Sequence, residues 1–172
     1  MLFIIEITKW DKSMEFKHIE NIKDYVNNLF LQGKIAKYFI KKAVVNVRPA
    51  IVGEEVITYI KDKNTNALIE ETRQIVKEEN LVIITNPGGE NYLVKKDIVE
   101  NNYVKGDKEG DYIAKAKPRK VIEIDENISF TAPWGETMNL QAGAWLNIDN
   151  MDKIYGINPE EFYETHIPYI EI

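Results

Sequence analysis

The sequence of 172 residues contains no cysteine, only two histidines and only two serines. The absence of cysteine excludes disulfides, thiolate nucleophiles and cysteine-ligated zinc or iron–sulfur sites. A Ser–His pair can be drawn between Ser129 and His166. We interpret His166 as a packing residue, because one residue without a converging set of groups does not make a catalytic site. The sequence therefore predicts no catalytic residues and no cofactor, and it favours a non-enzymatic protein.

Long apolar runs and an excess of positive charge are also absent. No stretch approaches the roughly 18 apolar residues of a membrane helix, and the N-terminus lacks the basic flank of a signal peptide. The formal net charge is −6, whereas proteins that bind the nucleic-acid backbone are generally basic. We therefore expect a cytoplasmic protein that binds neither membranes nor nucleic acid.

Two loops could hold an ion, and both are better explained otherwise. Asp62-Lys63-Asn64-Thr65-Asn66 begins like a calcium loop, but Ala67 stands where glycine is needed and Arg73 where glutamate is needed. Asn86-Pro87-Gly88-Gly89-Glu90 could present backbone N–H groups to a phosphate, but a strand follows it and not a helix. We predict a hairpin turn there and no metal site in the chain.

The N-terminal segment has the pattern of one strand and one amphipathic helix. The first ten residues read as a strand, and Gly33 is a plausible helix stop. Between about Lys17 and Leu31, apolar residues recur at three- and four-residue steps: Ile19, Ile22, Tyr25, Val26, Leu29 and Phe30. We expect this apolar stripe to pack against the first β-rich module, residues 44–104.

The remainder of the chain consists of short β-branched segments separated by Asn, Gly and Pro, which is typical of strands and turns. Comparing the chain with itself at an offset of 63 residues (143 minus 80) places Tyr92 over Tyr155 and Val99 over Phe162. The second copy contains Asn158-Pro159-Glu160-Glu161, which is a favourable helix start. The sequence therefore predicts two diverged copies of one small module.

We predict an α+β fold of two tandem antiparallel β-rich modules, barrel-like or sandwich-like, each with a short C-terminal helix. The expected boundaries are residues 1–43 for the N-terminal strand and helix, 44–104 for the first module, 105–114 for a linker and 115–172 for the second module. A module of this size is marginally stable alone, so we expect the two copies to pack together.

The second copy contains the motifs Trp134-Gly135-Glu136, Gly143-Ala144-Trp145-Leu146, Tyr155-Gly156-Ile157 and Pro159-Glu160-Glu161-Phe162, and the first copy contains Asn86 to Tyr92. These motifs resemble those of small phage and prophage proteins, including the bacterial family called PGDYG. Ala144 replaces the Asp of the family's Gly-Asp step, and His166 replaces its closing Tyr. The resemblance implies an origin in a mobile element and a fold, but no mechanism.

The best candidate for a binding contact is Trp134 beside Glu136, because the first copy has Glu71 at the matching position and the shared fold does not require the ring. We expect Trp134 at the rim of a concavity with Tyr155 or the Arg119-Lys120 pair. The predicted function is recognition of a host protein or a small ligand. The alternatives are an enzyme or sequestering protein for a nucleotide-like phosphate, and a structural part of a phage or conjugative assembly.

Overall fold

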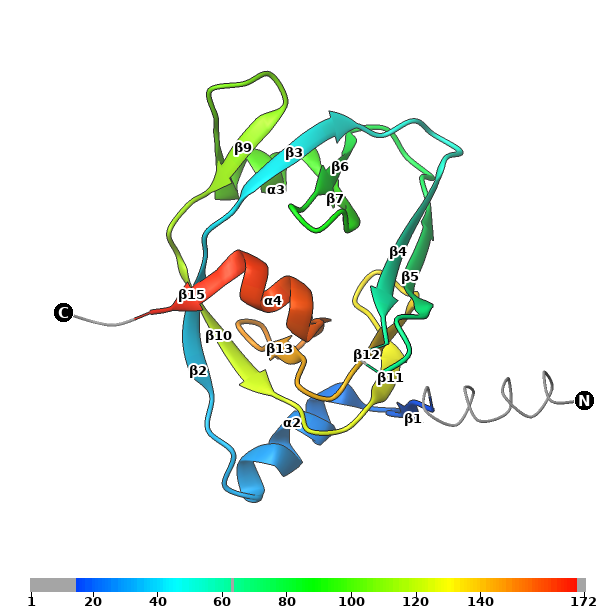
Figure 1. The fold of residues 1–172 in the computed structure, drawn as a ribbon, viewed down its shortest axis with the longest axis vertical. Helices are drawn as coiled ribbons and strands as arrows, with labels where there is room; N and C mark the ends of the chain where they lie inside the picture. The colour runs from blue at the N-terminus through cyan, green and yellow to red at the C-terminus, as the bar shows by residue number, and fades with distance from the viewer. Residues whose placement is uncertain (1–14, 63, 170–172) are drawn as a thin grey trace, which may run out of the picture.

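The computed structural model describes residues 15–62 and 64–169, and strands dominate its regular structure (Figure 1). The strand predicted in the first ten residues lies outside these ranges. The helices are α2 (Ile22–Leu31), α3 (Lys96–Asn102) and α4 (Pro159–Thr165). The strands are β1 (Lys17–His18), β2 (Lys37–Lys41), β3 (Val44–Pro49), β4 (Glu55–Lys61), β5 (Leu68–Ile75), β6 (Leu81–Thr85), β7 (Asn91–Lys95), β8 (Tyr103–Lys105), β9 (Asp111–Ala114), β10 (Pro118–Glu123), β11 (Ile128–Thr131), β12 (Thr137–Leu140), β13 (Trp145–Asn147), β14 (Tyr155–Ile157) and β15 (His166–Pro168).

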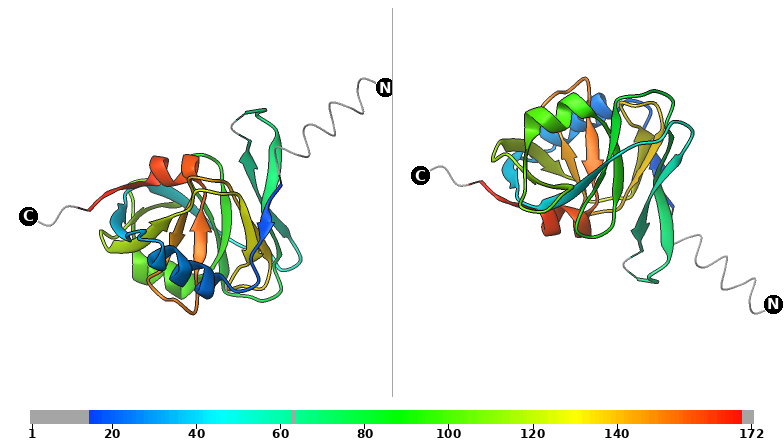
Figure 2. Two further views of the ribbon diagram at one scale, coloured as in Figure 1. Left: turned by 90° about the horizontal axis from the view of Figure 1, so that it is seen from below. Right: turned by 90° about the horizontal axis from the view of Figure 1, so that it is seen from above.

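Two five-stranded sheets have corresponding strand orders. The first sheet has the order β7-β6-β3-β9-β8, and the second has the order β14-β13-β10-β2-β15. Val82 pairs with Val94 in the first sheet, and Trp145 pairs with Ile157 in the second, so residues 63 positions apart have the same partners. The β4-β5 hairpin and the three-stranded sheet β1-β11-β12 complete the β structure, and the hairpin projects from the rest in Figure 2.

The leading strand of each half of the chain lies in the sheet of the other half. We call residues 37–110 the first half and residues 111–169 the second half. β2 belongs to the first half but pairs with β10 and β15, whereas β9 belongs to the second half but pairs with β3 and β8. Residues 111–114, within the segment expected to be a linker, thus form β9. The halves cannot separate without breaking these strand pairs.

This exchange creates a long two-stranded ribbon. β2 leads almost directly into β3, and β9 leads into β10, along the same side of the molecule (Figure 1). The two segments are antiparallel, from the Lys37–Val121 pair at one end to the Asn46–Asp111 pair at the other. Buried Phe39, Lys41 and Val45 alternate with outward-facing residues, so the ribbon has an inner and an outer face.

The prediction of an α+β fold with a helix at the C-terminal end of each module is wrong. The fold is mostly β, and α3 and α4 are two-turn helices that are each followed by a strand. Tyr103 and His166 adopt an extended backbone directly after these helices, with φ, ψ of −133°, 155° and −126°, 146°. The chain therefore leaves each helix early and pairs with β9 or β2.

Helix α2 is shorter than predicted, and it packs elsewhere. The side-chain oxygen of Asn21 accepts a hydrogen bond of 3.0 Å from the Asp24 N–H, which starts the helix at Ile22. Val26 and Leu29 are buried against apolar residues of the second half, among them Ile122, Phe130, Leu140 and Leu146. The expectation that the helix packs on the first module is therefore wrong. No helix in the described ranges has the length and apolar character needed to cross a membrane.

Candidate functional site

Two glutamates from different halves of the chain are buried close together. Glu71 in β5 is 1% exposed, and Glu161 in α4 is 7% exposed. The Tyr92 hydroxyl lies 3.1 Å from one Glu71 oxygen and also hydrogen-bonds to Glu161. The Asn158 amide donates to Glu71, and the Asn86 amide donates to Glu161 at 2.7 Å. These five residues tie the β6–β7 hairpin and β5 to the start of α4.

This acid pair retains a proton near neutral pH. Burial raises the pKa of Glu71 to about 7, although hydrogen bonds from Asn158 and Tyr92 oppose the rise. Burial, and then the charge of Glu71, raises the pKa of Glu161 to about 8. A tyrosine hydroxyl has one hydrogen and can donate to only one carboxylate. Tyr92 contacts both, so both contacts are hydrogen bonds only when one carboxyl is protonated and donates to Tyr92.

Glu90 extends the acid cluster toward the surface. Burial raises its pKa, with smaller contributions from the charges of Glu164 and Glu160 on α4. Its Oε2 atom and the Oδ1 atom of Asn86 are buried without a hydrogen-bond partner among the described residues. Within residues 15–62 and 64–169, however, no three His, Asp or Glu side chains are grouped so as to bind a metal ion.

Lys41 and His166, which pair across β2 and β15, adjoin the acids on the inner face of the ribbon. The Lys41 ammonium donates to the Tyr103 hydroxyl at 2.9 Å, and its charge lowers the pKa values of Glu161 and Glu90 against the effect of burial. His166 is 5% exposed and stacks on Phe162, with 4.6 Å between the ring centroids. We call these polar residues together the buried polar band: Glu71, Asn86, Glu90, Tyr92, Asn158, Glu161, Lys41, Tyr103 and His166.

His166 is neutral within this band. Burial first, and then the charges of Arg119 and Lys41, lower its pKa to about 3. Its Nδ1 atom lies 2.7 Å from the Thr165 hydroxyl, whereas Nε2 has no hydrogen-bond partner in the described part of the chain. The ring thus packs as a flat, uncharged group, in agreement with its interpretation from the sequence.

The structure brings together two of the five residues proposed as binding contacts. Arg119 and Tyr155 are close enough for the Arg119 charge to lower the pKa of Tyr155, against the dominant raising effect of burial. The Tyr155 hydroxyl accepts a hydrogen bond of 2.9 Å from Asn147. Lys120 pairs with Tyr38 on the opposite face of β10 from Arg119, because adjacent residues of a strand point to opposite faces.

Trp134 and Glu136 lie apart from this pair, in the turn between β11 and β12. Trp134 is 39% exposed.

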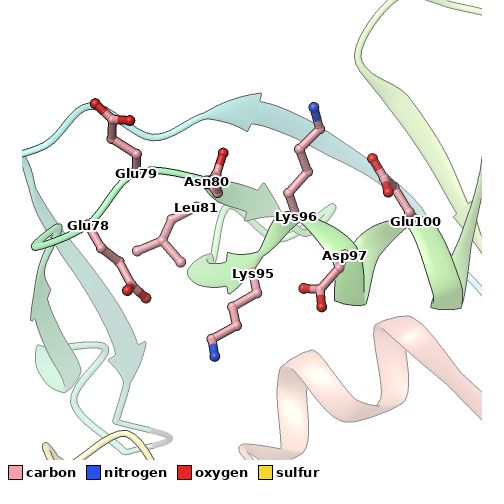
Figure 3. A pocket seen from close by; sticks show the side chains of 8 residues that line it. All are labelled: Glu78, Glu79, Asn80, Leu81, Lys95, Lys96, Asp97 and Glu100. Carbon is pink, nitrogen blue, oxygen red and sulfur yellow. The ribbon is translucent and has the colours of Figure 1, made fainter.

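A surface hollow of about 370 Å³ lies around the start of α3, and it is lined by Glu78, Glu79, Asn80, Leu81, Lys95, Lys96, Asp97 and Glu100. Lys95 and Lys96 extend to opposite sides in Figure 3, so their charges do not converge on one ligand position. Neither this hollow nor one beside Lys17 and Glu126 is lined by a predicted contact residue.

Sequence reasoning missed the acid pair. The sequence pattern presents Glu71 only as the counterpart of Trp134, and Glu161 only as an acid at the start of a helix. Alternation along β5 does not signal this pair, because Glu71 is the extra residue of a bulge between the Thr58–Thr72 and Tyr59–Glu70 pairs. A carboxylate at an inward position of a strand requires a partner. That partner lies 90 residues away.

Comparisons of the chain with protein-family models, with curated proteins and with solved structures gave no match. The resemblance to small phage proteins and to the PGDYG family therefore stays a prediction. A functional assignment has to come from the geometry of the polar band and of the surface around it.

Proposed function

We propose that the protein is a non-enzymatic binding protein that recognises a host protein or a small ligand. The supporting observation is that Glu71 and Glu161, whose pKa values would suit acid–base catalysis, are sealed from solvent. A catalytic acid or base must come within hydrogen-bond reach of its substrate. Here Tyr92, Asn86 and Asn158 occupy that position, so the pair joins the two halves of the chain.

Trp134 remains our candidate for the partner contact, with Glu136 beside it. Its large ring is partly exposed in a turn, where it could lose water-accessible area on docking. Tyr59 in β4 is also an exposed aromatic residue and provides a matched control. The two rings differ in their neighbours, because Glu136 accompanies only Trp134.

The proposal is tested by capture of partners on the immobilised protein from a bacterial lysate. Wild type and Tyr59→Ala should retain the same partner, and Trp134→Ala should lose it while its melting temperature stays near that of wild type. If the wild-type protein retains nothing beyond the bare matrix, the binding function is wrong. If Trp134→Ala retains as much as wild type, the contact lies elsewhere.

A second candidate function is binding of a nucleotide-like phosphate at Arg119. It is favoured by the absence of any hydrogen bond or ion pair to the Arg119 side chain within the described ranges, although Tyr155 and His166 lie near its charge. Titration calorimetry with ATP and with inorganic phosphate tests it. Arg119→Gln should abolish the heat of binding, and Arg73→Gln, whose side chain is already paired with Glu55 and Glu70, should not.

We also propose that the two halves are diverged copies of one unit, from a phage or an integrated element, which acts in the cytoplasm. The corresponding strand orders and the matching register support the duplication. Phage genes beside this gene would support the origin, and structural genes of a virion there would favour a role in an assembly.

A further inference from the structure

The outer face of the ribbon carries two rows of apolar side chains, and Lys42 lies between them. Val44 pairs with Ile113, and Ile113 also pairs with Val104, so these three side chains form a row across β3, β9 and β8. Pro118, Ile40 and Ile167 form the corresponding row across β10, β2 and β15. Tyr38 and Tyr169 extend the second row, and the Tyr169 N–H donates to the Tyr38 carbonyl at 2.9 Å.

Most residues of the two rows are exposed to solvent. Each of the following is between 38% and 51% exposed: Tyr38, Val44, Val104, Ile113, Ile167 and Tyr169. They come from adjacent, hydrogen-bonded strands on one side of the molecule (Figure 1). Exposed apolar side chains that gather on one face of a domain commonly mark an interaction site.

Lysines lie between and beside the two rows, although the whole chain has a net charge of −6. They are Lys42, Lys115, Lys117 and Lys120, of which the first three are exposed. None of these side chains forms an ion pair with a described residue. Three acidic residues, Asp107, Glu109 and Asp111, lie in or next to the turn between β8 and β9, and Asp111 pairs with Asn46. We call the two apolar rows and these four lysines the ribbon face.

We propose that the ribbon face is a docking surface for an acidic segment of a partner protein that also carries aliphatic side chains. The inference rests on the proposed binding function and names the chemistry of the partner. Aliphatic residues of the segment would cover Val44, Ile113 and Ile167, and its carboxylates would meet the unpaired lysines around them. Apolar contact at the centre with charge pairs at the rim is the usual construction of a protein interface.

Charge and shape favour this occupant over two others. Two copies of the chain stacked through this face would bring their unpaired lysines together, and like charges disfavour such an interface. Nucleic acid would satisfy the lysines, but it recognises proteins through phosphate contacts and base stacking and makes little use of rows of valine and isoleucine. An acidic protein segment complements both parts of the face.

Fluorescence anisotropy with three labelled probes tests the proposal on the full chain. The probes are a peptide of alternating glutamate and valine, the same peptide with lysine in place of glutamate, and an oligothymidylate. The variants are Lys115→Glu with Lys117→Glu, and Ile113→Glu. Lys77→Glu and Ile51→Glu are matched controls, because both residues are exposed and lie outside the ribbon face.

We expect the acidic peptide alone to bind wild type, with affinity that falls as salt is added. The lysine variant and Ile113→Glu should each bind it about tenfold more weakly or worse, and the controls should bind it as wild type does. Should Ile113→Glu fail to fold, the lysine variant carries the test. Absence of acidic-peptide binding, equal binding of the basic peptide, or tighter binding of the oligothymidylate overturns the proposal.

Two further outcomes separate this inference from the proposed function. If the lysine variant captures the same partner from lysate as wild type does, the ribbon face is not the docking surface, whereas the binding function stands. If wild type elutes as a dimer in size-exclusion chromatography and the lysine variant as a monomer, the face joins copies of the chain and the proposal is wrong.

Discussion

Glu71 and Glu161 lie in different halves of the chain, and the Tyr92 hydroxyl contacts the carboxyl groups of both. The two carboxyls can lie close together without repelling each other, because burial keeps at least one of them protonated and uncharged. A proton therefore contributes directly to the contact between the halves.

Stability should decrease as the pH rises from about 4.5 to about 8. The ordinary pKa of these carboxyls is 4.5, and in the folded chain it is about 7 for Glu71 and about 8 for Glu161. In this window the folded state binds more protons than the unfolded state. The stabilisation is therefore complete below the unfolded pKa and is lost as the pH rises through the folded values. For Glu71 alone the upper bound is on the order of 3 kcal/mol.

Urea unfolding at pH 5 and at pH 8 measures this dependence. Other charged groups face the pair, namely Glu90 and Lys41, so the comparison is made against Glu71→Gln, which cannot ionise. Glu71→Gln should flatten the pH dependence, and Glu78→Gln, at an exposed position, should leave it as in wild type. Equal pH dependence in Glu71→Gln and wild type would show that the pair is not the cause.

Cutting the chain between β8 and β9 should leave the two pieces associated. A protease site inserted after Lys108 interrupts the turn, but β2 still pairs with β10, and β9 still pairs with β3. Each piece lacks one central strand of its own sheet, so neither completes its fold alone. We expect the cleaved protein to co-elute in size-exclusion chromatography until urea is added. Separate elution in native buffer contradicts the exchange of strands.

Phe162→Ala should cost about 3–5 kcal/mol of unfolding free energy. Phe162 is 0% exposed, and its ring centroid lies 4.8 Å from that of Phe39 and 5.0 Å from that of Trp145. Tyr155→Ala should cost less, because the Tyr155 ring is only half-buried and packs at the border of two apolar clusters. Chemical denaturation compares them, with Tyr59→Ala as an exposed control. A larger effect for Tyr155 would contradict this ranking.

Gly156→Ala should also be destabilising, by about 1–3 kcal/mol. A Cβ atom at Gly156 would overlap the side chain of Leu140, which is itself 0% exposed and cannot move aside freely. Thermal melting of Gly156→Ala alone and combined with Leu140→Val measures the clash. The smaller side chain should reduce the penalty of the alanine, so the double variant should lose less than the sum of the single variants. Additive losses would place the strain elsewhere.

Local signals predicted several elements correctly. Asn158 and Pro159 predicted the start of α4, and the glycines after Pro87 predicted the β6–β7 hairpin, where the Asn86 N–H donates to the Glu90 carbonyl at 2.9 Å. Residues that the offset of 63 superposes also have corresponding partners in the two sheets. The helix start and the hairpin turn depend on neighbours within a few positions.

The sequence by itself determined the short strands and turns that follow Gly33, the helix of residues 22–31 and the start of α4, because period, capping and turn chemistry act over a few residues. Only the tertiary structure decided that β2 and β9 exchange sheets and that Glu71 meets Glu161. Alternation shows which side chains of a strand face inward, but it does not show which strand lies beside it. The same is true of a buried carboxyl, whose protonation depends on groups that the fold brings from distant parts of the chain.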